Sequence, residues 1–208
     1  MKFLPRENFP SLLNVLRQDG YHCIGPQIKD GTIIYDTINK ITDLPQGIHD
    51  KQAPGQYRLE STESSRYFAW ANGPQALKPL TFAPRETLWR VKRNQEEKLN
   101  FVETLPEGLA LAVIGVRSCD LAALYLQDQH FCYQQYPDAY YNKRRRALFL
   151  IAVDCSHPAD TCFCHSTGDG PAVTFGFDLA LTEIEEGFII RINLTVSLPI
   201  TRKSTDFG

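Results

Sequence analysis

The chain has 208 residues, enough for one domain or two small lobes with a sizeable core. Apolar residues make up 43% and charged residues 22%, as in an ordinary globular protein. A net charge of −2 gives no basis for a nucleic acid or an anionic membrane as partner.

We expect no signal peptide at the N-terminus, because Pro5, Arg6, Glu7 and Pro10 interrupt its short apolar segment. No run approaches the roughly 20 apolar residues that a membrane span needs. We therefore expect a cytoplasmic protein. In the cytosol thiols stay reduced, so clustered cysteines are more often metal ligands than disulfides.

The first half is expected to form a β-rich N-terminal lobe over residues 1–104. Its predicted elements are a helix at 7–19, a strand at 31–38, a loop at 42–54 and short strands at 57–59 and 67–70. The charged segment 90–103 is expected to be exposed, and it leads to the boundary between the lobes.

The sequence of the second half predicts a βαβ unit, within a lobe that covers residues 105–194. Residues 109–116 and 147–153 are continuous apolar runs, as in strands buried on both faces. Between them Ser118 or Asp120 can cap a helix that reaches Phe131. A hairpin is expected at 172–182 and 187–194, followed by an atypical tail at 195–208. The fold class is therefore mixed α/β, with parallel strands in the βαβ unit.

This topology predicts that four cysteines meet at one edge of the sheet. Cys119 follows the first apolar strand and Cys155 follows the second, and parallel strands end on the same side. Cys162 and Cys164 follow in a Gly- and Pro-containing loop that can fold back over this edge. Cys119 also begins the predicted helix, whose positive end lowers the pKa of a thiol.

Two metal centres fit four thiolates, an iron–sulfur cluster and a structural zinc ion. Around one zinc ion the sulfurs lie about 3.8 Å apart, whereas an extended C-x-C step spans roughly 6.6 Å. The Cys162-Phe163-Cys164 step therefore favours a cluster, most simply of the 4Fe–4S type. Zinc stays an alternative, and so do thiols that never bind a metal.

Four further residues are expected close to this centre. Arg117 either neutralises an anionic cluster or pairs with an acid, and Asp120 follows Cys119 directly. His157 and His165 lie in the cysteine loop, where they are either substitute ligands or neighbours of the ligands.

At these residues the chain resembles a known family of 4Fe–4S dicluster proteins. It is similar to the N-terminal region of the iron–sulfur electron-transfer subunits of sulfhydrogenase (the beta subunit) and of anaerobic sulfite reductase. The matching runs are P-G-Q-Y-R-L (54–59), Y-F-A-W-A-N-G-P (67–74), K-P-L-T-F-A-P-R-E (78–86), G-V-R-S-C-D-L-A-A-L (115–124), D-A-Y-Y-N-K-R-R (138–145), D-C-S-H-P-A-D-T-C-F-C-H-S-T-G-D-G-P (154–171) and G-F-D-L-A-L-T (176–182).

The resemblance implies an electron-transfer subunit of a multi-subunit oxidoreductase rather than a free-standing enzyme. Its partners would be a flavin/NAD(P)-binding subunit together with a hydrogenase or sulfite reductase catalytic subunit. Such proteins also carry two C-x₂-C-x₂-C-x₃-C-P runs, which these 208 residues lack. We therefore expect either an electron-transfer subunit or a truncated N-terminal part of one.

Two other functions remain open at this point. One is a zinc-stabilised assembly or interaction module without redox activity. The other is an enzyme with a reactive cysteine and His157 or His165 as its base.

Overall fold

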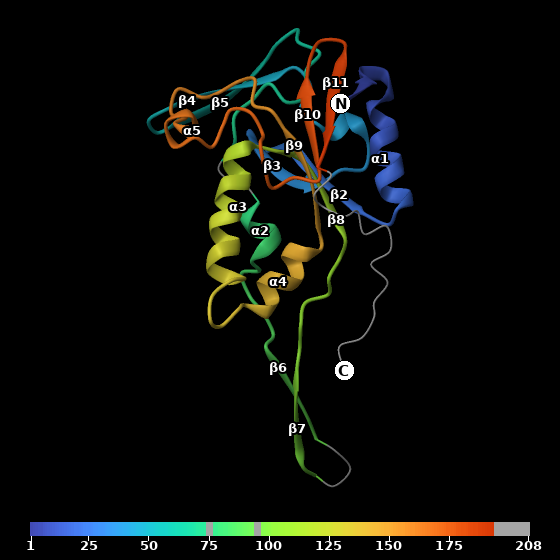
Figure 1. Cartoon of the computed structure of the whole chain (residues 1–208), viewed down its shortest axis with the longest axis vertical. Helices are drawn as coiled ribbons and strands as arrows, with labels where there is room; N and C mark the ends of the chain where they lie inside the picture. Colours follow the sequence, from blue (N-terminus) through green and yellow to red (C-terminus); the bar gives the residue numbers. More distant parts are fainter. Residues whose placement is uncertain (74–76, 94–96, 194–208) are drawn as a thin grey trace.

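The computed structural model describes residues 1–73, 77–93 and 97–193. Within these ranges the fold is mixed α/β, as predicted, and is built on a seven-stranded sheet of order β1-β11-β10-β9-β8-β2-β3 (Figure 1). The strands of this sheet are β1 (Lys2–Pro5), β2 (His22–Lys29), β3 (Thr32–Thr37), β8 (Leu111–Val116), β9 (Leu148–Val153), β10 (Leu179–Glu183) and β11 (Gly187–Ile192).

The predicted βαβ unit is confirmed. Strands β8 and β9 are parallel neighbours, and helix α3 (Ser118–Phe131) connects them. Parallel pairing extends to β2 beside β8 and to β10 beside β9. The predicted C-terminal hairpin is confirmed as β10 and β11, which are antiparallel.

Helices cover both faces of the sheet. On one face α1 (Phe9–Gln18), preceded by the 3₁₀ turn η1 (Arg6–Asn8), packs against alternate residues of the central strands. On the other face Leu121 and Leu124 of α3 pack against the strand residues that point to that side, such as Val113 and Leu150. This alternation arises because successive side chains of a strand point to opposite faces. It explains why β8 and β9 have continuous apolar sequences.

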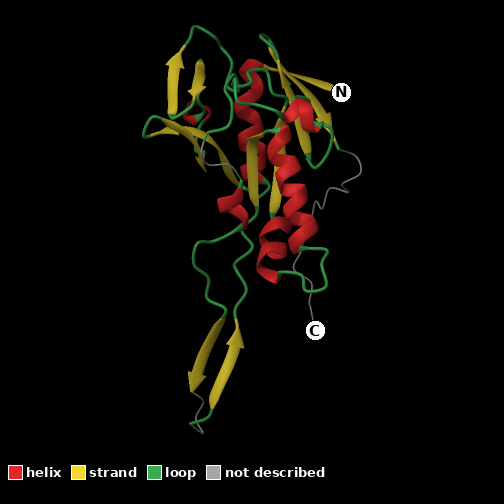
Figure 2. Ribbon diagram, turned by 90° about the vertical axis from the view of Figure 1, so that its left-hand side faces the viewer, coloured by secondary structure: helices red, strands yellow, loops and turns green. Residues whose placement is uncertain are grey.

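The remaining elements are small. They are the 3₁₀ turn η2 (Ile41–Asp43), helices α2 (Lys78–Thr81), α4 (Ala139–Arg146) and α5 (Cys164–Thr167), the antiparallel pair β4 (Ile48–Ala53) and β5 (Gln56–Ser61), and the antiparallel pair β6 (Trp89–Arg93) and β7 (Leu99–Glu103). The β6–β7 ribbon projects away from the body of the molecule (Figure 2). Its residues are exposed, as predicted for the segment 90–103.

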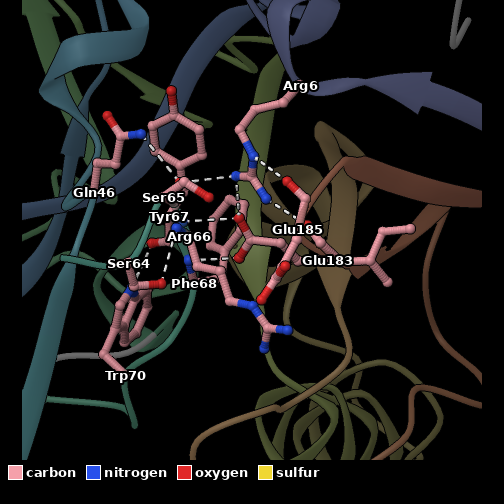
Figure 3. Close-up of polar contacts among 11 residues, drawn as sticks. Arg6, Gln46, Ser64, Ser65, Arg66, Tyr67, Phe68, Trp70, Glu183 and Glu185 are labelled. Carbon is pink, nitrogen blue, oxygen red and sulfur yellow. Dashed lines mark hydrogen bonds and ion pairs between the residues drawn. The ribbon is translucent and has the colours of Figure 1, made fainter. Parts of the chain in front are cut away.

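Two predictions for local structure were wrong, and one strand was missed. The segment 42–54, expected as a loop, contains η2 and β4. Strand β2 was not predicted, because Gly25 and Pro26 interrupt its apolar pattern. Residues 67–70 do not form a strand. The backbone N–H groups of Tyr67 and Phe68 instead donate to the buried carboxylate of Glu183 (Figure 3).

Strands from both sides of residue 104 share the central sheet. The division of the chain into two lobes there stays a prediction. The tail at 195–208 lies outside the described residues. Within the described ranges, no helix has the length and apolar character required to cross a membrane.

Candidate metal centre

Strands β8 and β9 deliver two of the predicted ligands to one edge of the sheet. Cys119 lies in the first turn of α3, three residues after β8 ends, and Cys155 lies two residues after β9 ends. Because the two strands are parallel neighbours, their carboxyl ends open on the same side.

The loop that follows Cys155 returns to this edge. The Cys155 N–H donates to the carbonyl oxygen of Pro171 at 3.1 Å. The Ser118 hydroxyl contacts the carbonyl oxygens of Asp169 and Ala172. Gly170 packs so closely that a Cβ there would lie 3.1 Å from Cys164 Sγ. The loop therefore holds Cys164 against the start of α3.

Three thiols gather at this edge. Cys119 is itself exposed, but partial desolvation by the atoms packed around it, with the Asp120 carboxylate and the thiols of Cys164 and Cys155, raises the pKa of Cys119 to about 12. The net direction is therefore opposite to the one expected from the position of Cys119 at the start of the helix. A metal ion must displace the proton to bind here, so metal binding releases protons.

Cys162 has a different position. It is exposed in the loop before α5, and its N–H donates to the Ala159 carbonyl at 3.0 Å. The extended Cys162-Phe163-Cys164 step is not found, because Phe163 has ψ of 12° and Cys164 begins α5. That step therefore does not decide between a cluster and a zinc ion.

The side chains at this edge offer thiols, the ligand type that both iron–sulfur clusters and zinc ions take. All six cysteines are free thiols. Among the described residues, no three His, Cys, Asp or Glu side chains converge closely enough to hold a metal ion. A multi-iron cluster spreads its ligands more widely than one ion does.

Arg117 places a buried cation at the end of β8, two residues before Cys119. Its guanidinium donates to the carbonyl oxygens of Phe68 and Trp70, both at 2.7 Å, and its Cζ lies 4.5 Å from the centroid of the Trp70 ring. Within the described part of the chain, Arg117 forms no ion pair with a carboxylate and its Nε has no hydrogen-bond partner. Burial raises the pKa of Asp120, and the electrostatic interaction of Asp120 with Arg117 opposes that rise. An additional anionic centre nearby would stabilise the buried cation further.

Asp120 and Asn72 form a polar pair beside Cys119. Asp120 is buried, which raises its pKa, and its Oδ2 accepts from the Arg117 N–H at 3.2 Å and from Asn72 Nδ2 at 2.8 Å. Asn72 Nδ2 also lies 3.8 Å from Cys119 Sγ. Sequence reasoning did not identify Asn72 as part of the site. The available signal was its place in the run Y-F-A-W-A-N-G-P.

A buried carboxylate fixes the segment that carries Trp70 and Asn72. Glu183 accepts from Tyr67 N at 2.8 Å, Phe68 N at 2.9 Å and Arg6 Nη1 at 2.8 Å (Figure 3). The segment is therefore held by charge-assisted hydrogen bonds rather than by a strand ladder.

The two predicted histidines have different surroundings. The ring of His157 stacks on His49 with centroids 4.4 Å apart, and its Nε2 lies 3.4 Å from the Asp50 carbonyl oxygen. His165 is exposed in α5. Whether either histidine binds a metal stays a prediction.

Comparison with known proteins identifies one informative relative. The chain is 26% identical to sulfhydrogenase 2 subunit beta of Pyrococcus furiosus over 191 residues, which cover 91% of this chain and 47% of that protein. The chain thus spans about half the length of the curated relative that it matches. No family model and no solved structure matches the chain.

Proposed function

We propose that the chain is an iron–sulfur electron-transfer subunit, or the N-terminal part of one, in a hydrogenase- or sulfite-reductase-type complex. The observation that carries this proposal is the gathering of Cys155 and Cys164 around Cys119, where the returning loop packs against the start of α3. Similarity to a sulfhydrogenase beta subunit supports it, because the matched region includes these cysteines.

In this proposal Cys119, Cys155, Cys162 and Cys164 bind one 4Fe–4S cluster. When bound, the cluster supplies one-electron transfer. Cys162 reaches the centre by a shift of its exposed loop. Arg117 offsets negative charge at the site, and Asn72 donates a hydrogen bond toward the sulfur of Cys119. Such neighbours set the reduction potential of a cluster.

The proposed partners are a flavin/NAD(P)-binding subunit together with a hydrogenase or sulfite reductase catalytic subunit in the cytoplasm. Phe163, between two of the proposed ligands, is 72% exposed. It gives the rim of the site an apolar contact point, which is typical of a surface that meets another protein.

Electron paramagnetic resonance (EPR) of anaerobically prepared protein tests this function. After chemical reduction, we expect a signal from a one-electron-reduced cluster that disappears on reoxidation. A protein that contains zinc and gives no such signal would instead support a zinc-stabilised module.

A further inference from the structure

The β6–β7 ribbon is an exposed arm whose base lies beside Tyr140 of α4. All residues of both strands are exposed, and the ribbon extends well beyond the central sheet (Figure 1). A two-stranded hairpin alone is only marginally stable in water. Large apolar side chains gathered on such an arm indicate a surface that another chain covers.

One face of the ribbon carries most of its large apolar side chains, with Arg93 and Glu103 at its two ends. Residues paired across the two strands share a face, so the register places one set of large apolar side chains together. This set, between 51% and 61% exposed, consists of Trp89, Val91, Leu99 and Phe101. The opposite face carries Arg90 and Lys92 on β6 and Val102 and Asn100 on β7.

The two edges of the ribbon differ in charge. Strand β6 carries three cations, Arg90, Lys92 and Arg93, whereas β7 carries one charge, Glu103. Charged edge strands resist pairing with other strands. Among the described residues, β7 pairs only with β6, so its other edge is open and poorly protected.

We propose that β7 pairs antiparallel with β7 of a second copy of this chain, about a twofold axis at Phe101. This register places Phe101 opposite Phe101, Leu99 opposite Glu103, and Asn100 opposite Val102. In this register no two like charges face each other across the strands, and an aromatic pair forms at the centre. The equivalent pairing of β6 would place Arg90 opposite Lys92, which is unfavourable.

The charges at the ends of the ribbons are complementary in this arrangement. Glu103 of one copy lies in the same cross-strand row as Arg93 of the other, on the same face and two strand spacings away, roughly 10 Å between Cα atoms. Their long side chains can meet over Leu99. The product is a four-stranded sheet, which exceeds the three strands needed for independent stability.

Matched variants of the full chain test the proposal by sedimentation equilibrium. Phe101→Asp places two carboxylates opposite each other and removes the aromatic pair, so the dimer should dissociate about tenfold more readily. Val91→Asp makes a similar change on the same face, but on β6, and should have a much smaller effect. A wild-type monomer at all concentrations, or equal effects of both variants, would overturn the proposal.

Photo-crosslinking provides a second readout that does not depend on loss of a contact. With p-benzoylphenylalanine in place of Phe101, illumination should link two copies, with the new bond within residues 99–103. Crosslinks confined to one chain, or to a different surface of the second copy, would contradict the register. Neither experiment depends on the metal centre, since the ribbon lies outside it.

Discussion

Asn72 Nδ2 lies 3.8 Å from the sulfur of Cys119, while the same nitrogen donates to Asp120 at 2.8 Å. This amide comes from a segment far from Cys119 in sequence, and the buried Glu183 and Asp50 carboxylates fix its backbone. The packing of the N-terminal half therefore determines where a hydrogen-bond donor lies beside Cys119 in the candidate centre.

Removing this amide should lower the reduction potential of the proposed cluster. An N–H donor stabilises the more negative, reduced state, so Asn72→Ala should shift the midpoint by about 20 to 60 mV toward lower values. A redox titration followed by EPR measures the shift. Asn14→Ala, at an exposed position of α1 on the other face of the sheet, is the control. Equal midpoints in both variants and the wild type would show that Asn72 does not act on the centre.

Replacing Cys155 and, in a second variant, Cys132 should distinguish a cysteine that binds the cluster from one that does not. Cys155→Ser should lose most of the iron and sulfide that the wild type retains, because serine is a poor ligand for this type of cluster. Cys132→Ser should keep the full content, since Cys132 lies at the opposite end of α3. Retention of iron by the Cys155 variant would remove this residue from the proposed ligand set.

Glu183→Gln should reduce the free energy of unfolding by about 2 to 3 kcal/mol, since the side chain loses charge-assisted hydrogen bonds to Tyr67, Phe68 and Arg6. Urea denaturation measures this loss. Glu185→Gln removes the same charge from an exposed position in the same turn and should change the stability by less than about 0.5 kcal/mol. Equal stability of the two variants would contradict a structural role for Glu183.

Gly115 should tolerate alanine less well than Gly20. Both have positive φ, +88° and +86°, so either substitution costs about 1 to 2 kcal/mol in backbone strain. A Cβ on Gly115 would also lie 2.9 Å from the Phe68 ring, whereas Gly20 has open space. Gly115→Ala should therefore be less stable by roughly a further 1 to 3 kcal/mol in urea denaturation. Equal losses of stability in the two variants would show that the Phe68 ring can move away from the added methyl group.

The sequence was sufficient for the parts of the fold with strong local patterns. Continuous apolar runs predicted β8 and β9, and their parallel order explained why Cys119 and Cys155 end at one edge. The residues between 67 and 72 were less predictable. Their conformation depends on the carboxylate of Glu183, more than 100 residues away, and no local pattern encodes such a contact.

The same limit applies to the candidate site. Periodicity and spacing could place cysteines at an edge, but not the guanidinium of Arg117 against Trp70 or the amide of Asn72 near Cys119. These contacts depend on how the N-terminal segment packs over the βαβ unit. The C-x-C step was also expected to be extended, whereas α5 begins at Cys164 and turns the chain.

The most direct test of the central claim is the metal and sulfide content of protein purified without oxygen. A bound 4Fe–4S cluster predicts a brown protein with about four iron and four sulfide per chain. A colourless protein with one zinc ion per chain and no sulfide would contradict the account and identify the cysteines as a structural zinc site.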